Sequence, residues 1–136
     1  MNKFRIIGHT ADIGLVAYGN TLAEAFANSA CGLFSIMVDL RTVRKIESRI
    51  LKVEEDDSES LLHEWLNNLI YSFDVEMLLF KQFEIKFFDE NSFTATCHGE
   101  RCDISRHKLK LGVKAATYHM LAVDKIHNRV RVIFDV

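Results

Sequence analysis

The sequence contains no proline and only six glycines among its 136 residues. Linkers between domains are commonly rich in proline, glycine or serine, so this composition gives no sign of an internal boundary. No repeat of solenoid length is visible either. We therefore expect residues 1–136 to form a single domain, a size for which one hydrophobic core is sufficient.

Cysteine is also scarce, since Cys31, Cys97 and Cys102 form an odd set without a CxxC pair. Such a set argues against a disulfide framework and against a structural zinc site. No apolar run approaches the ~20 residues of a membrane span, and the first residues lack the basic and then apolar pattern of a signal sequence. These absences predict a cytoplasmic protein with reduced thiols and no membrane contact.

An excess of positive charge is missing as well. The 17 basic and 19 acidic residues give a formal net charge of −2, which is not typical of a protein that neutralises many phosphates. If RNA is involved, we expect a partner protein to bind it. Apolar material is plentiful, because 49% of the residues are hydrophobic and ten are Phe. That composition is typical of a chain that folds around one core.

Hydrophobic periodicity predicts two amphipathic helices. Apolar residues recur at helical spacing over residues 21–38, with Thr21 as the expected N-cap and Glu24 completing a capping-box pattern. A second apolar stripe follows an acidic run and extends over residues 62–73, and the acidic charges suit a helix N-terminus. Trp65 lies in this stripe, so we assign it to the core.

Alternation of apolar and polar residues predicts six or seven strands, several of them joined as neighbouring hairpins. The candidate segments are residues 3–7, 13–18, 45–55, 82–88, 93–102, 112–123 and 130–134. Together with the helices they predict an α+β fold, a two-layer sandwich with two main helices packed on one face of a largely antiparallel or mixed sheet. The pattern does not give the strand order.

Four parts of the sequence resemble the archease family in order and spacing. They are residues 9–14 (HTADIG) with 17–21, the helical segment 62–71, the late strand 113–119, and the closing residues 132–136. These segments span most of the chain. The loop from Arg101 to Lys110 departs from the family pattern, most visibly at Cys102 and Ile104.

The resemblance implies a metal site. By motif position, the family's early Asp and its terminal pair correspond to Asp12, Asp135 and Val136. From the residues alone, an Asp in a turn is more often a helix cap or a surface group. Three oxygen donors would suit a hard cation, with Ca²⁺ the first expectation and Mg²⁺ or Mn²⁺ as alternatives.

The resemblance also implies a function. It indicates an accessory protein without catalytic activity of its own, which activates an RtcB-type RNA ligase in tRNA splicing or RNA repair and meets RNA through that ligase. Two alternatives stay open: a stand-alone metal-dependent hydrolase or nuclease using the same carboxylates, and a metal-independent, chaperone-like interaction module. The sequence has no nucleophile motif, Gly-rich phosphate loop or HExxH segment.

Several further residues have both a functional and a structural interpretation. Lys114 is a candidate contact to a partner, although a strand lysine is more often only solvated. His9 and His119 are interpreted as hydrogen-bonded structural groups. Asp74 and Glu76 follow the second helical stripe, and we expect them to be solvated charges near a helix terminus.

Overall fold

The computed structural model describes residues 3–8 and 11–136. The elements in this part of the chain are β1 (Phe4–Gly8), β2 (Asp12–Tyr18), α1 (Leu22–Met37), the 3₁₀ helix η1 (Leu40–Thr42), β3 (Glu47–Glu54), α2 (Ser58–Glu76), β4 (Leu78–Lys86), β5 (Ser92–Arg101), β6 (Ala115–Asp124) and β7 (Arg129–Asp135). No helix within these residues combines the length and apolar character needed to cross a membrane.

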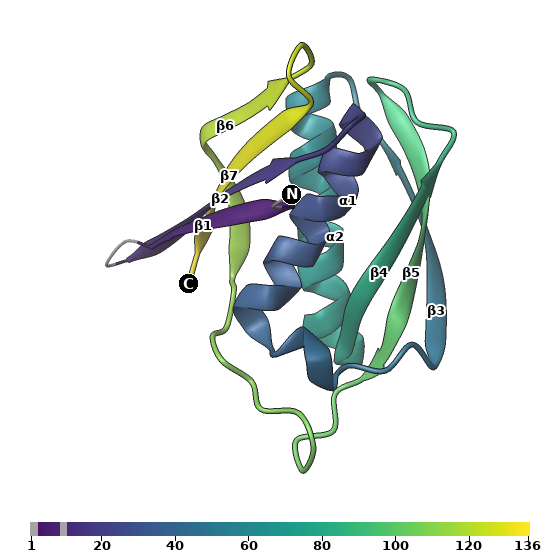
Figure 1. Cartoon of the computed structure of the whole chain (residues 1–136), viewed down its shortest axis with the longest axis vertical. Coiled ribbons are helices and arrows are strands. Elements are labelled where there is room, and N and C mark those ends of the chain that lie inside the picture. Colours follow the sequence, from purple (N-terminus) through teal and green to yellow (C-terminus); the bar gives the residue numbers. More distant parts are fainter. Residues whose placement is uncertain (1–2, 9–10) are drawn as a thin grey trace.

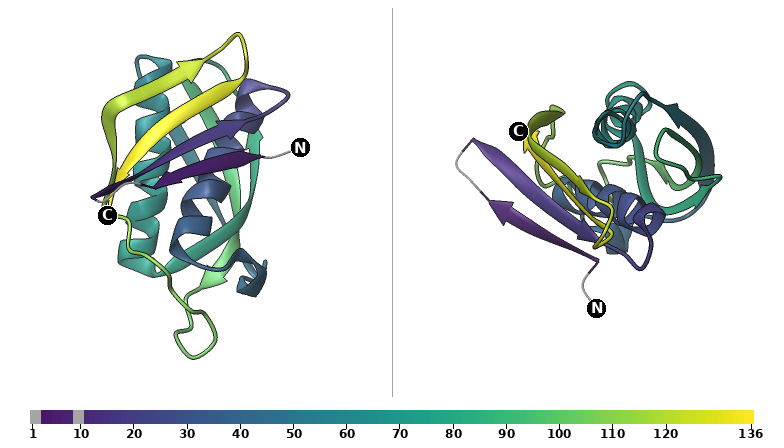
Figure 2. Two further views of the ribbon diagram at one scale, coloured as in Figure 1. Left: turned by 60° about the vertical axis from the view of Figure 1, so that its left-hand side comes forward. Right: turned by 90° about the horizontal axis from the view of Figure 1, so that it is seen from above.

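The strands form two antiparallel sheets with the helices between them (Figures 1 and 2). One sheet has the order β1-β2-β7-β6 and the other β3-β5-β4. This confirms the α+β class, the two main helices and the antiparallel strands. The molecule has three layers rather than the expected two, because α1 contacts β2 of one sheet and β4 of the other. Ten of the 16 residues of α1 are buried, so a single sheet could not cover the apolar surface of this helix.

Both helices begin at side-chain caps that satisfy free backbone N–H groups. Thr21 Oγ1 accepts a hydrogen bond from Glu24 N at 3.1 Å, which confirms the expected N-cap. The Glu24 carboxylate accepts from Asn20 N at 3.2 Å, one residue before the position that a standard capping box uses. Asp57 caps α2 by accepting from Ser60 N at 2.7 Å, and this backbone bond lowers the pKa of Asp57.

Trp65 is fully buried at the centre of the core, as the helical stripe predicts. Its indole Nε1 donates to the Phe26 carbonyl oxygen of α1 at 3.0 Å, which joins the two helices. Its ring meets Phe83 of β4 and Phe93 of β5 edge to face, with centroid distances of 5.8 and 5.1 Å. Edge-to-face pairs add to the free energy gained from burial, so this cluster fixes α2 on the three-stranded sheet.

Strand β6, at the edge of the four-stranded sheet, breaks the alternation that its sequence suggests. Its register against β7 shifts between Thr117 and Ala122, and Met120 in this bulge has a φ of 55°. Asn67 of α2 holds the regular part of the strand, since its amide donates to Ala116 O at 3.2 Å and accepts from Ala116 N at 2.9 Å. A side chain thus replaces a neighbouring strand at this edge.

The three cysteines are free thiols. Cys97 has no exposed surface, and burial raises its pKa to about 12. At pH 8 such a thiol is ionised in only about one molecule in ten thousand. We expect Cys97 to resist a thiol reagent in the native protein, whereas half-buried Cys102 reacts; colour release from Ellman's reagent, before and after denaturation, measures both. Equal rates for the two thiols in single-cysteine variants would contradict this.

Candidate metal site

The two predicted carboxylates are direct partners in the four-stranded sheet. Asp12 opens β2, Asp135 closes β7, and the two residues lie opposite each other in the antiparallel register. Opposed residues have Cβ atoms about 5 Å apart and point to the same face. Figure 1 shows the end of β7 beside the end of the β1–β2 hairpin. The fold therefore brings together residues from near the two ends of the chain.

This carboxylate pair has no neutralising group in the described structure. Asp135 is exposed and Asp12 is half-buried. Neither carboxylate forms a side-chain hydrogen bond or ion pair with residues 3–8 or 11–136, and the bond from Lys114 N at 2.8 Å goes to the main-chain oxygen of Asp135. Like charges directly opposed across two strands are unfavourable, so a bound cation would relieve the repulsion.

Among residues 3–8 and 11–136, the donors available to a cation at this pair are all oxygens. Within the described part of the chain, no three side chains of the His, Cys, Asp and Glu types gather as a metal site. The carboxylates of Asp12 and Asp135 would therefore need the main-chain oxygens of half-buried Val136 and water to complete a shell. Such a set fits Ca²⁺, Mg²⁺ or Mn²⁺ and lacks the nitrogen and sulfur ligands that favour zinc.

The other candidates lie at different distances from this pair. Lys114 is exposed and immediately precedes β6, whose first residue Ala115 also pairs with Asp135. His119 is exposed in the β6 bulge. Asp74 and Glu76 lie in the last turn of α2, which leads into the other sheet. His9 lies outside the described residues.

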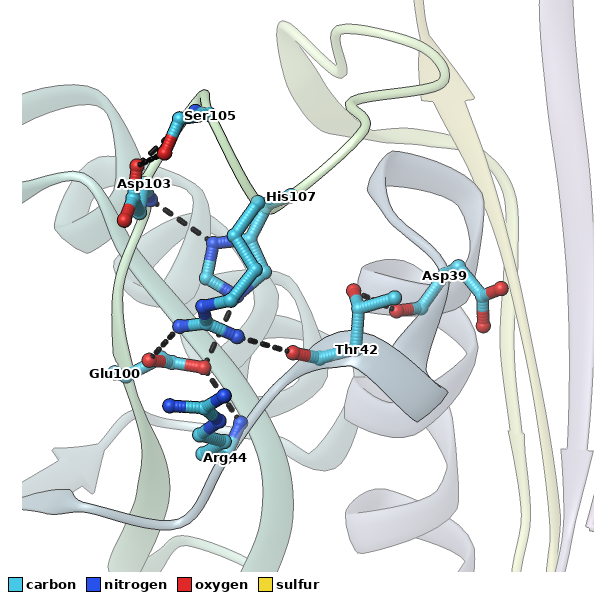
Figure 3. A network of polar contacts seen from close by, with 8 residues as sticks. Asp39, Thr42, Arg44, Glu100, Asp103, Ser105 and His107 are labelled. Atoms are coloured by element: carbon cyan, nitrogen blue, oxygen red, sulfur yellow. Dashed lines mark hydrogen bonds and ion pairs between the residues drawn. The ribbon is translucent and has the colours of Figure 1, made fainter.

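The sequence patterns gave no sign of a polar network centred on the buried side chains of Glu100 and His107 (Figure 3). Glu100 of β5 is 5% exposed. One carboxylate oxygen pairs with the Arg106 guanidinium, and the other accepts from Arg44 N at 2.6 Å and contacts His107 Nε2 at 3.0 Å. Arg106 also donates to Thr42 O at 2.8 Å. A single carboxylate therefore ties the loop after β5 to the segment after η1.

The hydrogen bonds around Glu100 define its charge and the tautomer of His107. Burial alone would raise the pKa of Glu100, but donors from Arg44, Arg106 and His107 outweigh it and the pKa is lowered. Asp103 N donates to His107 Nδ1 at 2.9 Å. Because Nδ1 is an acceptor, Nε2 bears the proton and donates to Glu100. Both carboxylate oxygens of Glu100 and both ring nitrogens of His107 thus have a matching partner.

The same loop supports the C-terminal end of α1. Lys110 N donates to Met37 O at 2.8 Å, and Lys110 Nζ donates to Ser35 O at 3.0 Å. These carbonyls have no partner within the helix, so the loop acts as its C-cap. The loop then continues to Lys114, whose backbone N–H donates to Asp135 O at 2.8 Å just before β6 begins.

These features define a class of protein: a small α+β domain in which two antiparallel sheets enclose two helices, and one sheet ends in a carboxylate pair. The model of the Archease protein family matches residues 4–136. The chain belongs to the archease family, which confirms the resemblance inferred from its motifs.

Relatives from several organisms support the assignment. The chain is 37% identical over 129 residues to protein archease of Sulfurisphaera tokodaii, covering 94% of this chain and 93% of the relative. It is 41% identical over 129 residues to protein archease of Thermococcus gammatolerans, with coverage of 93% and 91%.

Two solved structures have the same fold. The solution structure of Methanobacterium thermoautotrophicum protein 1598 superposes with a TM-score of 0.83 at 34% identity, covering 100% of both chains. A crystal structure from Thermotoga maritima, described as an archease and possible chaperone, gives a TM-score of 0.65 at 22% identity, with coverage of 96% and 94%. At that lower identity the likeness concerns the fold alone.

Proposed function

We propose that this chain is an accessory protein that activates an RtcB-type RNA ligase in the cytoplasm, through a divalent cation bound by Asp12, Asp135 and Val136. It promotes guanylylation of the ligase and repeated turnover in tRNA splicing or RNA repair, and it has no catalytic activity of its own. Family membership supports the class of function. The direct opposition of Asp12 and Asp135 across β2 and β7 is the observation that carries the site.

The arrangement suits a metal that is presented to another protein. Asp135 is exposed at the end of a strand, so a cation there would keep coordination positions open to ligands from outside the chain. Bound in this way, the ion supplies a template for phosphate oxygens. Asp12 and Asp135 hold the ion from one face of the sheet, and the exposed Lys114 beside them is a candidate contact to the ligase or to a phosphate.

Multiple-turnover ligation by the cognate ligase tests the proposal. The wild-type chain should stimulate ligation, and Asp12→Asn or Asp135→Asn should reduce the stimulation by about tenfold or more, because even the loss of a group that supports a metal ligand costs about 10- to 100-fold. Asp74→Asn provides a matched control, because it removes an exposed carboxylate at the end of α2. Stimulation by that variant should equal that of wild type.

Ion binding itself gives a second measurement, made without the ligase. Ca²⁺ should raise the melting temperature of the wild-type chain and leave that of both Asn variants unchanged. In chelator, the Asn variants should be as stable as wild type or slightly more so, because one charge of an opposed pair is gone. This separates loss of the ion from loss of the fold.

Each other outcome points to a different function. Turnover of RNA or another substrate by the purified chain alone would favour a metal-dependent hydrolase or nuclease. Full stimulation by Asp12→Asn and Asp135→Asn would favour a metal-independent interaction module. If no combination of metal ion and nucleotide gave stimulation, the ligase assignment would be overturned.

A further inference from the structure

Three arginines surround a cavity on the outer face of the four-stranded sheet. The cavity measures about 350 Å³, and Arg5, Arg129 and Arg131 line it together with Tyr18, Ala122 and Asp124. We call this feature the arginine groove. It lies apart from the carboxylate pair, and the ligase-activating function proposed above makes no use of it.

The sheet register explains why these side chains meet. Arg5 of β1 is opposite Val16 of β2, and Val16 is opposite Arg131 of β7. In the adjacent row, Tyr18 of β2 is opposite Arg129. Opposed residues, and residues two apart on a strand, point to the same side. Cations from β1 and β7 therefore share one face, with the apolar Val16 between them.

The positive charge of the groove is only partly neutralised. Arg129 pairs with Asp124 at 3.1 Å, and the same carboxylate accepts from the backbone N–H groups of Ile126 and His127 at 3.1 Å. Arg131 uses Nε to donate to the neutral Met120 O at 2.9 Å. Among the residues that the structure describes, Arg5 has neither an ion pair nor a side-chain hydrogen bond. The lining thus holds three guanidinium groups and one carboxylate.

Guanidinium groups recognise phosphate through planar, paired hydrogen bonds, and Arg129 and Arg131 are each oriented by a bond that leaves other N–H donors available. Because the cations are spread over two rows of the sheet, they suit successive phosphates better than one small anion. Tyr18 adds an aromatic ring to the lining, which a nucleotide base can use for stacking. An acidic peptide would use the positive charge of the groove but would have no base to stack on the Tyr18 ring.

We propose that the arginine groove binds the phosphate backbone of a single-stranded RNA. Arg131 and Asp135 lie four residues apart on β7 and on the same face, which corresponds to about 13 Å along a strand. RNA held in the groove would therefore run toward the carboxylate pair. The proposal assigns a direct, weak RNA contact to the chain itself. The net charge of the chain had suggested that RNA is contacted only through a partner.

The test uses the full chain without ligase, so its failure is separable from failure of the ligase assay. Anisotropy of a fluorescent single-stranded RNA should show weak binding, with Kd on the order of 10⁻⁴ M near physiological salt. Arg5→Gln should weaken binding several-fold and reduce the slope of log affinity against log salt by about 0.7, the value for one lost contact to a single strand. Arg41→Gln is the matched control, because Arg41 is 90% exposed on η1 outside the groove.

Amide NMR shifts locate the bound RNA and distinguish RNA from other anionic ligands. Single-stranded RNA should shift residues of the arginine groove, and GTP or inorganic phosphate at equal phosphate concentration should bind more weakly because each offers fewer phosphates. Equal binding of GTP would overturn the RNA assignment in favour of a mononucleotide site. Equal competition by poly-aspartate would indicate a surface for an acidic protein, and unchanged RNA binding by Arg5→Gln would refute the groove.

Discussion

Replacing Gly99 with alanine should destabilise the protein by about 3 kcal/mol or more. A Cβ atom at Gly99 would lie 1.8 Å from Leu79 O and 2.7 Å from Phe80 Cα, both of them backbone atoms of β4. The β4–β5 register shifts just beyond this point, between Phe80 and Gln82, so the β4 backbone passes directly over Gly99. Relief of the clash requires β4 to separate from the central strand of its sheet.

Urea unfolding followed by the fluorescence of the single, fully buried Trp65 measures this effect. Gly112→Ala is the matched control, because a Cβ there meets nothing within 4 Å. Its stability should equal that of wild type or exceed it by up to about 1 kcal/mol, since alanine restricts the unfolded chain. If the free energy of unfolding of Gly99→Ala lay within about 1 kcal/mol of wild type, about one third of the expected loss, β4 would be shown to shift away from the added Cβ at little cost.

Removing the Glu100 carboxylate should have the second large effect. Glu100→Ala leaves the buried His107, the Arg106 guanidinium and Arg44 N without their acceptor. Loss of one member of a buried charged network costs about 3 kcal/mol. Glu90→Ala serves as the control, because its pair with Lys125 is 62% and 48% exposed and such surface pairs contribute about 1 kcal/mol or less.

The pH dependence of stability tests whether Glu100 stabilises the fold in its ionised form. Its pKa in the folded protein lies below the ordinary value of 4.5. A lowered carboxyl pKa gives a stabilisation that is complete above the unfolded-state pKa and is lost as the pH falls through the folded-state pKa. The free-energy difference between wild type and Glu100→Gln should therefore be constant near neutral pH and shrink below about pH 4.5. A difference that stays flat to pH 3 would rule out this role of the charge.

Glu100 also shows where sequence patterns stop being informative. Alternation along β5 places it with Thr96 and His98 on the side opposite the buried Cys97, which predicts a solvated carboxylate. It is buried because Arg106 and His107 return over it from the following loop. Periodicity describes one strand at a time, and coverage by the loop that follows the strand leaves no trace in that period.

The candidate metal site could be predicted only in part. Neither spacing nor composition indicates that Asp12 and Asp135 meet, and only the resemblance to archeases suggested it. The structure makes them partners through the pairing of β2 with β7. Binding of an ion there stays a prediction. The arginine groove depends on the same pairing, and a formal net charge of −2 gave no hint of it.

The sequence by itself determined the local elements: both helices with the Thr21 cap, the two hairpins β4–β5 and β6–β7, the core position of Trp65, and the α+β class. These depend on periodicity and on contacts between near neighbours, which a sequence displays directly. Tertiary structure alone decided the division into two sheets, the burial of Glu100, and the placing of two acidic and three basic residues on one sheet face. The division into sheets and the shared face arise from strand order and register, which join residues far apart in the chain. The burial of Glu100 arises from the path of the loop after β5, which returns over the strand.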